Sequence, residues 1–358
     1  MSLSIISLRL RNQRLSGGRF TNPAEVVSWL GAVQAQEYAD TKWALGLRMQ
    51  RATDAQIERA VNEGRILRTH VLRPTWHFVA PADIRWMLAL TGPRVSARMA
   101  PYNRRLELDA AIFRRSERAI VRALRGGVPL TRQELKTVLE RAGLQVDGTQ
   151  RLAHIVMQAE LDAVICSGPR RGTQATYMLL DERVPASRTR SRDDTLAELA
   201  RRYFKSHGPA ALQDFVWWSG LTTADARAGI AMVERELVGD VVDGKTYWFV
   251  ASSSRAPGTR GTAYLLPLYD EYLIAYKDRS AAVDPSFWRP GWSRDPFSAP
   301  IVVNGRVVGG WRRLLKGDTV VVNVTPVASL NKRDRSAVAD AAFAYSMFLG
   351  FDLELSWK

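Results

Sequence analysis

The chain has 358 residues, with 51 Lys and Arg against 36 Asp and Glu, and so carries a net charge of +15. Its length predicts two to four compact units, and its basic excess indicates a polyanionic partner, most simply nucleic acid. The single cysteine, Cys166, excludes an internal disulfide and a cysteine-based zinc site. No apolar run approaches the roughly 18 residues of a membrane span, and the N-terminus lacks a signal-peptide pattern, so we expect a cytoplasmic, nucleoid-associated protein. The alternative source of the charge is an arginine-rich surface without a ligand.

The first predicted unit covers residues 1–104. Asn22, followed by proline, predicts the start of a helix over residues 22–33, and a second helix is expected over residues 53–63. Residues 66–80 are β-like. Helices followed by a β-hairpin are typical of a winged helix, so this is the predicted fold of the unit.

The second predicted unit covers residues 105–186. Thr131 and Glu134 have the spacing of a capping box ahead of a helix. Later, two β-like segments flank a turn rich in Gly and Pro, which predicts a wing with Arg170 and Arg171 at its tip.

The third predicted unit covers residues 192–252, where a helix, a short turn containing glycine and a second helix precede a hairpin at Asp243–Gly244. From residue 257 to residue 358 the composition is β-rich, with a strong hairpin signal at Asn304–Gly305. The predicted fold class is therefore α+β, with three tandem winged-helix units followed by a small C-terminal β-barrel.

Two glutamines, Gln34 and Gln36, stand two residues apart in a mostly apolar segment. In a helix their side chains would diverge by about 200°, whereas in an extended segment or a turn they would share a face. Two such amides can hold one water between them, because each offers two donors and one acceptor. The alternatives are a helix C-terminus, where the amides cap free carbonyls, and a role for the neighbouring Glu37 in activating the water.

Three segments resemble the AlkZ/YcaQ-type DNA glycosylases. Residues 34–48, which open Gln-Ala-Gln-Glu-Tyr-Ala, are similar to the family's first signature. Residues 72–79, Leu-Arg-Pro-Thr-Trp-His-Phe-Val, are similar to its Arg-Gly-Thr-x-His segment, with Pro74 where glycine is usual. Residues 265–279, which end Tyr-Asp-Glu-Tyr-Leu-Ile-Ala-Tyr-Lys-Asp-Arg, are close to its C-terminal block.

The resemblance implies three winged helices, a C-terminal barrel, removal of alkylated bases, and a catalytic role for Gln34 and Gln36. A glutamine has no useful pKa, so it orients water rather than acting as a general base. That chemistry suits N3- or N7-alkylated purines, which are cationic and leave as neutral bases. We therefore expect a monofunctional, monomeric DNA glycosylase acting on double-stranded DNA with alkylated bases, crosslinked bases included, without a metal or organic cofactor.

DNA contacts are expected from the wing, the β-segment of the first unit and the C-terminal block: Arg68, Arg73, Thr75, His77, Arg170, Arg171, Thr173, Gln174, Lys277 and Arg279. A hydrogen-bonded structural role is the alternative for His77. For the whole chain, the alternatives are a non-catalytic winged-helix DNA-binding protein and, less favoured, an RNA-binding module.

Overall fold

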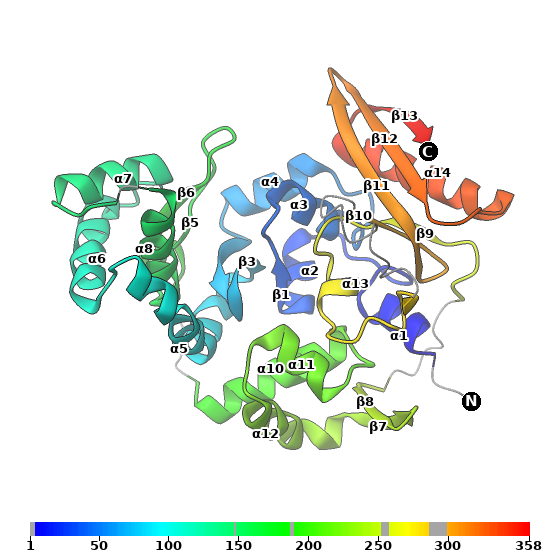
Figure 1. The fold of residues 1–358 in the computed structure, drawn as a ribbon, viewed down its shortest axis with the longest axis horizontal. Helices are drawn as coiled ribbons and strands as arrows, with labels where there is room; N and C mark the ends of the chain where they lie inside the picture. The colour runs from blue at the N-terminus through cyan, green and yellow to red at the C-terminus, as the bar shows by residue number, and fades with distance from the viewer. Residues whose placement is uncertain (1–3, 147, 187–189, 252–257, 286–298) are drawn as a thin grey trace.

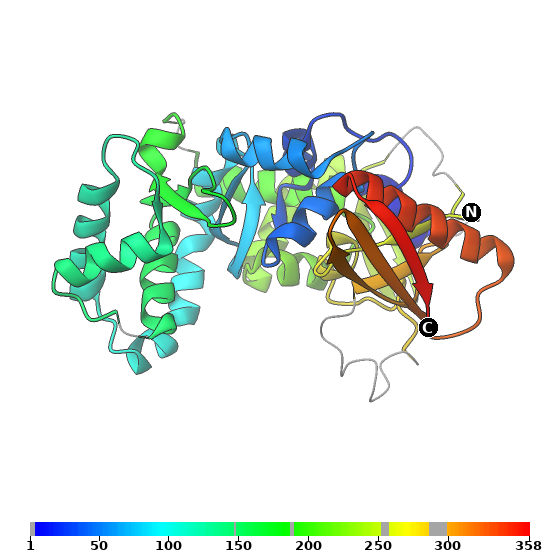
Figure 2. The same ribbon diagram turned by 90° about the horizontal axis from the view of Figure 1, so that it is seen from above.

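The computed structural model describes residues 4–146, 148–186, 190–251, 258–285 and 299–358. The chain is a mixed α+β protein of elongated shape (Figures 1 and 2). The segment from α6 to β6 lies at one end, and a five-stranded sheet with the last helix lies at the other. None of the helices in these ranges is long and apolar enough to cross a membrane.

The N-terminal part contains a three-stranded antiparallel sheet in the order β1-β3-β2. Its elements are α1 (Ile5–Asn12), α2 (Pro23–Leu30), β1 (Ala32–Gln34), α3 (Tyr38–Gly46), α4 (Asp54–Asn62), β2 (Leu67–Val71), β3 (Arg73–Val79) and the long helix α5 (Pro81–Arg105). The helix expected over residues 22–33 ends early, because Gly31 takes a positive φ of +81° and turns the chain into β1. Asn22 does cap α2, since its side chain accepts a hydrogen bond from the Ala24 amide.

The second segment packs three helices on a small antiparallel sheet in the order β4-β6-β5. Its elements are α6 (Ala110–Leu124), β4 (Leu130–Thr131), α7 (Arg132–Arg141), α8 (Thr149–Leu161), β5 (Ile165–Ser167), β6 (Thr176–Leu179) and the short α9 (Leu180–Arg183). The predicted capping box is confirmed: Glu134 N donates to Thr131 Oγ1 at 3.3 Å, and Thr131 N donates to Glu134 Oε2 at 2.7 Å.

The third segment repeats this order of elements. It contains α10 (Arg192–Ser206), α11 (Leu212–Ser219), α12 (Thr223–Val233), a 3₁₀ turn (Glu234–Glu236), β7 (Val238–Val242) and β8 (Lys245–Phe249). An isolated bridge between Ala210 and Trp248 takes the place of the first short strand. The predicted hairpin turn is confirmed, because Asp243 and Gly244 have φ values of 48° and 74°.

The C-terminal segment forms a sheet in the order β13-β12-β11-β10-β9, with α14 against it (Figure 2). Its elements are β9 (Ala263–Leu265), α13 (Glu271–Ile274), β10 (Ala299–Val303), β11 (Arg306–Lys316), β12 (Thr319–Pro326), α14 (Lys332–Leu349) and β13 (Asp352–Trp357). The edge strands β9 and β13 do not pair with each other, so the described strands form an open, curled sheet, a half-barrel that is consistent with the predicted small β-barrel without closing it.

The first segment shares its apolar core with the C-terminal sheet. Trp43 of α3 packs on Tyr345 of α14 with ring centroids 5.1 Å apart, and Tyr345 in turn packs on Trp311 of β11 at 5.0 Å. The opposite side of the first segment packs on α10 and α11. The β1–β3 sheet is therefore enclosed between elements from distant parts of the chain.

Candidate active site

The Gln-x-Gln segment runs along the edge of the N-terminal sheet. Gln34 is the last residue of β1, lies opposite His77 of β3 and is 6% exposed. The extended path continues for one more residue, because Ala35 N donates to Trp76 O at 2.6 Å, and Gln36 follows at a bend. The helix-capping interpretation of the glutamine pair is therefore wrong, since Gln34 ends a strand and Gln36 lies at the bend that follows it.

Three residues from separate elements hold Gln34. Its backbone N–H donates to Glu271 Oε1 of α13 at 2.9 Å. Its side-chain Oε1 accepts from Arg73 Nη2, at the start of β3, at 2.8 Å. Its carbonyl accepts from Thr41 Oγ1 of α3 at 3.1 Å. Backbone and amide oxygen are thus fixed, and the remaining polar group of Gln34 is its side-chain NH₂.

Glu271 is completely buried and joins the site to the third segment. Its second oxygen accepts from Trp218 Nε1 at 3.0 Å and lies 3.5 Å from His207 Nε2. Burial alone would raise the pKa of this carboxyl, but His207, Arg73 and the Gln34 N–H outweigh it and lower the pKa. Glu271 is therefore a buried carboxylate whose oxygens are both occupied by protein donors.

A tight turn in the third segment brings α11 against the site. Gly220, with φ +68°, ends α11, and a Cβ there would lie 2.2 Å from Leu72 O in the β2–β3 turn. Only glycine allows this approach. As a result Trp218 reaches Glu271, and the Trp217 carbonyl accepts from Arg73 Nη1 at 3.3 Å.

Gln36 and Glu37 are less enclosed than Gln34. Gln36 is half-buried, and its carbonyl accepts from Arg68 Nη2 at 3.4 Å, while its side-chain amide has no hydrogen bond to any residue that the structure describes. Glu37 is exposed and precedes α3, where its carbonyl accepts from Thr41 Oγ1 at 2.8 Å. The Gln36 amide is thus available to a ligand.

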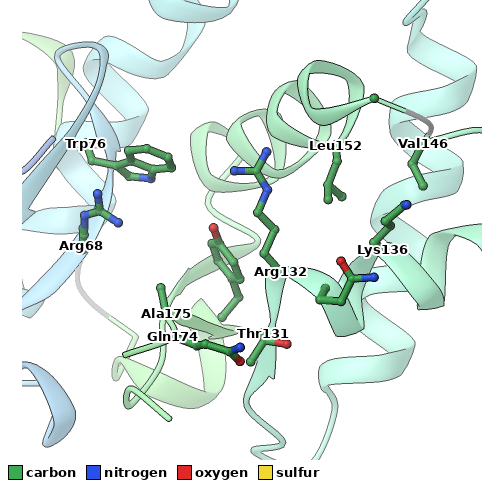
Figure 3. Close-up of a pocket in the computed structure, with 12 residues that line it drawn as sticks. Arg68, Trp76, Thr131, Arg132, Lys136, Val146, Leu152, Gln174 and Ala175 are labelled. Carbon is green, nitrogen blue, oxygen red and sulfur yellow. The ribbon is translucent and has the colours of Figure 1, made fainter. Parts of the chain in front are cut away.

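A basic groove of about 660 Å³ lies on the other face of the β2–β3 hairpin, between the first and second segments. Figure 3 shows Arg68 and Trp76 on one side, facing Arg132 and Lys136 on the other. Arg68 links the groove to the glutamine segment, because its Nε donates to Ala35 O at 3.0 Å while its guanidinium stacks on Trp76 at 4.3 Å. No acidic side chain is among the lining residues: Arg68, Trp76, Thr131, Arg132, Gln133, Lys136, Val146, Gly148, Leu152, Gln174, Ala175 and Tyr177. The groove therefore suits a phosphate backbone.

Comparison with known proteins places this geometry in a family. The "DNA glycosylase AlkZ-like" family model matches residues 27–348, which include the Gln-x-Gln segment, Arg73 and Glu271. The chain belongs to this family. It is therefore an enzyme of the DNA glycosylase class, which acts on N-glycosyl bonds.

Two relatives agree with the assignment. A Streptomyces sahachiroi protein described as an interstrand DNA cross-link repair glycosylase is 24% identical over 328 residues, which is 86% of each chain. The solved structure of Streptomyces sahachiroi DNA glycosylase AlkZ has the same fold, with a TM-score of 0.83, 22% identity and full coverage of both chains.

The structure buries His77 completely and leaves Thr75 half-buried. His77 is 0% exposed, and burial, with the nearby Arg73 charge, holds its pKa well below the ordinary value. Its Nδ1 therefore carries the proton and donates to Thr75 O at 2.9 Å, while Nε2 has no partner in the described part of the chain. The prediction that His77 contacts DNA is not supported by this burial, and the structural alternative fits.

The β5–β6 hairpin, which was predicted as a wing, projects from the second segment (Figure 1). Both of its arginines contact neighbouring parts of the protein. Arg170 lies 3.2 Å from Glu58 Oε1 and stacks on Tyr38 at 4.2 Å, and Arg171 pairs with Glu134 at 2.7 Å. Arg170 is thus held against the first segment and only partly exposed, whereas Arg171 keeps about half of its side chain exposed, as do its exposed neighbours Thr173 and Gln174. Contact between these residues and DNA stays a prediction.

The predicted basic residues of the C-terminal block separate. Lys277 is exposed, whereas Arg279 is half-buried and donates from Nε to Leu273 O at 3.1 Å. The charge of Arg279 contributes to the lowered pKa of Arg73, after burial as the main cause, so Arg279 lies near the site. Among the described residues no group of three or more His, Cys, Asp or Glu could hold a metal ion.

Sequence reasoning missed the partners of Gln34. Arg73 was expected on DNA, and Glu271 was seen only as part of a motif, although both bind Gln34 directly. Arg132 and Lys136 of the groove were not singled out either. The sequence did offer a signal for these two residues, because both are basic and they lie four positions apart on one helix, which places them on the same face.

Proposed function

We propose that the chain hydrolyses the N-glycosidic bond of cationic N3- or N7-alkylated purines in double-stranded DNA. The water is held by Gln34 and Gln36. The observation that carries this proposal is the environment of Gln34: a buried amide, fixed on its oxygen by Arg73 and on its backbone by Glu271, with its NH₂ left for a ligand.

The neutral site matches the chemistry of a cationic leaving group. Among the described residues, the buried carboxylate beside Gln34 is that of Glu271, and both of its oxygens accept from protein donors. Glu37 is exposed and lines a separate pocket with Asp40 and Arg313. His77 is neutral and cannot protonate a leaving base. An alkylated purine needs no protonation, so orienting the water and stabilising charge by dipoles are sufficient. An unmodified purine would lack the required acid.

We further infer that the three repeated segments are winged-helix units and that the basic groove binds the DNA backbone. The groove adjoins the glutamine segment through Arg68, which contacts the backbone carbonyls of Ala35 and Gln36. A duplex in the groove would therefore lie next to the catalytic segment. The name of the Streptomyces sahachiroi relative supports including interstrand crosslinks among the substrates.

The test is single-turnover release of N7-methylguanine from a duplex with one lesion, with enzyme in excess and the free base measured by mass spectrometry. Wild-type enzyme should release the base with and without EDTA. Gln34→Ala and Gln36→Ala should each slow release by roughly 10²–10³-fold, the scale of one lost preorganised hydrogen-bond donor. Full activity in both variants, or no release by wild type, would refute the mechanism. A duplex with one N7–N7 guanine crosslink tests the extension.

A further inference from the structure

We propose that Arg73 fixes the direction of the Gln34 amide, so that Gln34 donates a hydrogen bond to the attacking water and Gln36 accepts one from it. This inference rests on the proposed hydrolysis by a glutamine-held water. It assigns unequal roles to the two glutamines and makes Arg73 a positioning residue.

The chemistry of arginine determines which end of the amide faces it. Arg73 Nη2 lies 2.8 Å from Gln34 Oε1. A guanidinium has five N–H donors and no acceptor, so the group opposite it must be the amide oxygen. A flipped amide would place its NH₂ against a cation, with donor facing donor. The arrangement seen here is therefore the stable one.

Arg73 is itself held in place. It is the first residue of β3, its Nη1 donates to Trp217 O at 3.3 Å, and the Glu271 carboxylate provides a compensating charge. Glu271 also binds the Gln34 backbone, so the arginine and the backbone of the glutamine are oriented by one buried group. The direction of the amide is thus built into the fold before substrate arrives.

The free end of Gln34 is its NH₂ group. Gln34 is only 6% exposed, and its Nε2 has no hydrogen-bond acceptor within the ranges that the structure describes. Nε2 is not among the buried polar atoms of these ranges that lack a partner, so the NH₂ group remains accessible to a water. The NH₂ group therefore points to a ligand that accepts a hydrogen bond.

The stereochemistry of water then assigns Gln36. A water has two lone pairs and two hydrogens. One lone pair accepts from Gln34 Nε2, and the other must point at the anomeric carbon to form the new C–O bond as the C–N bond to the base breaks. Both hydrogens must then be donated. Gln36 Oε1 accepts one of them, and the proton released after attack leaves to solvent.

Isosteric carboxylates test the two roles. Gln34→Glu keeps an oxygen for Arg73 but replaces the NH₂ with a second acceptor, so release of N7-methylguanine should slow by roughly 10²-fold or more. Gln36→Glu keeps the acceptor, so its rate of base release in the same assay should be at least about tenfold higher than the rate of Gln34→Glu. Equal losses, or the reverse order, would overturn the assignment.

A double-mutant cycle tests Arg73. Arg73→Met should slow single-turnover release at saturating enzyme by roughly 10- to 100-fold, the scale of a lost hydrogen bond to a charged group. In a Gln34→Ala background the same change should have almost no further effect, because Arg73 acts through Gln34. Arg73→Lys, which retains a donor, should recover part of the rate.

Arg85→Met is the matched control, because Arg85 is also half-buried and donates to a backbone carbonyl, Val184 O at 3.0 Å, away from the site. Its effect on the rate should be the same in both backgrounds. An Arg73 effect that is also unchanged in the Gln34→Ala background would refute the positioning role. If circular dichroism shows that Arg73→Met does not fold, the release rates of Gln34→Glu and Gln36→Glu still test which glutamine donates to the water and which accepts from it.

The outcomes separate this inference from the proposed function. Full activity of Gln34→Ala, or no base release by wild type, removes the water mechanism itself. If Gln34→Ala is slow but Gln34→Glu and Gln36→Glu release the base at equal rates, the water mechanism stands. Only the separate donor and acceptor roles of the two glutamines are then refuted.

Discussion

Arg48 and Asp270 form a bidentate ion pair in which neither side chain is exposed. Nη1 and Nη2 of Arg48 each lie 2.8 Å from an Asp270 oxygen, and the two residues are 222 positions apart in the chain. The pair fixes the start of α13 against the first segment. Since Glu271 follows Asp270 directly, this contact sets the position of the carboxylate that binds Gln34.

Removing one member of this pair should destabilise the fold strongly. Asp270→Ala leaves a buried, uncompensated guanidinium, so we expect the free energy of unfolding to fall by about 3–5 kcal/mol in urea titrations. The double variant Arg48→Met, Asp270→Ala should lose less than the sum of the single variants. A loss below about 1 kcal/mol for Asp270→Ala would show that water reaches the pair.

Stability should fall as the pH drops below about 6.5, the ordinary histidine value. Burial lowers the pKa of both His77 and His207 in the folded protein. Between the folded and unfolded pKa values the unfolded chain binds protons that the folded chain does not, so each histidine lowers the free energy of unfolding by up to about 1.4 kcal/mol per pH unit.

Urea unfolding between pH 7.5 and pH 5 measures this dependence. His77→Gln, which does not titrate, should give a shallower slope than wild type. An identical slope would mean that His77 becomes protonated in the folded state.

Glu37 should be dispensable for catalysis. Its side chain is exposed and makes no cap hydrogen bond, so Glu37→Gln should change the single-turnover rate by less than about threefold. The wild-type rate should also be nearly flat between pH 6.5 and 8.5, because no group in the proposed mechanism titrates there. A rate that rises with pH and loses that dependence in Glu37→Gln would identify Glu37 as the base.

DNA affinity should fall steeply as the salt concentration rises. Basic residues of the groove should account for part of this salt dependence. If Lys136 binds one phosphate, Lys136→Met should reduce the slope of log K against log [salt] by roughly 0.9. Lys332→Met removes the same charge from α14, at the opposite end of the molecule from the groove (Figure 1), and should leave the slope unchanged. Equal effects of both variants would indicate diffuse binding without a defined groove.

At the tip of the β5–β6 hairpin, Gln174 should contribute more to DNA binding than Arg170 does. Gln174 is exposed and lines the groove, so Gln174→Ala should weaken lesion binding without changing the melting temperature. Arg170→Ala should instead lower the melting temperature, because Arg170 contacts Glu58 and Tyr38. Gel-shift titration and thermal unfolding of both variants separate these effects.

Local features of the sequence predicted local structure well. The cap at Asn22, the capping box at Thr131 and the turns at Asp243–Gly244 and Asn304–Gly305 involve residues within a few positions of each other, and the structure contains all of them. The open C-terminal sheet was not predictable in this way, because closure depends on whether β9 and β13 meet.

The candidate site was predicted only in its central residues. The spacing of Gln34 and Gln36 indicated a shared water, and the β-like pattern of residues 66–80 placed Thr75 and His77 on a strand. Neither pattern shows which face the protein covers, so the burial of His77 was missed. The hydrogen bond between Gln34 and Glu271 joins positions 237 residues apart, and no local signal reports such a contact.

That separation has a consequence during synthesis. A ribosome that has made the first three segments has produced Gln34, Gln36 and Arg73, but it has not yet made Glu271 or the C-terminal sheet on which the first segment packs. The glutamine segment therefore gains its final support only late in synthesis. Chains released before residue 271 would lack the carboxylate that holds the Gln34 backbone.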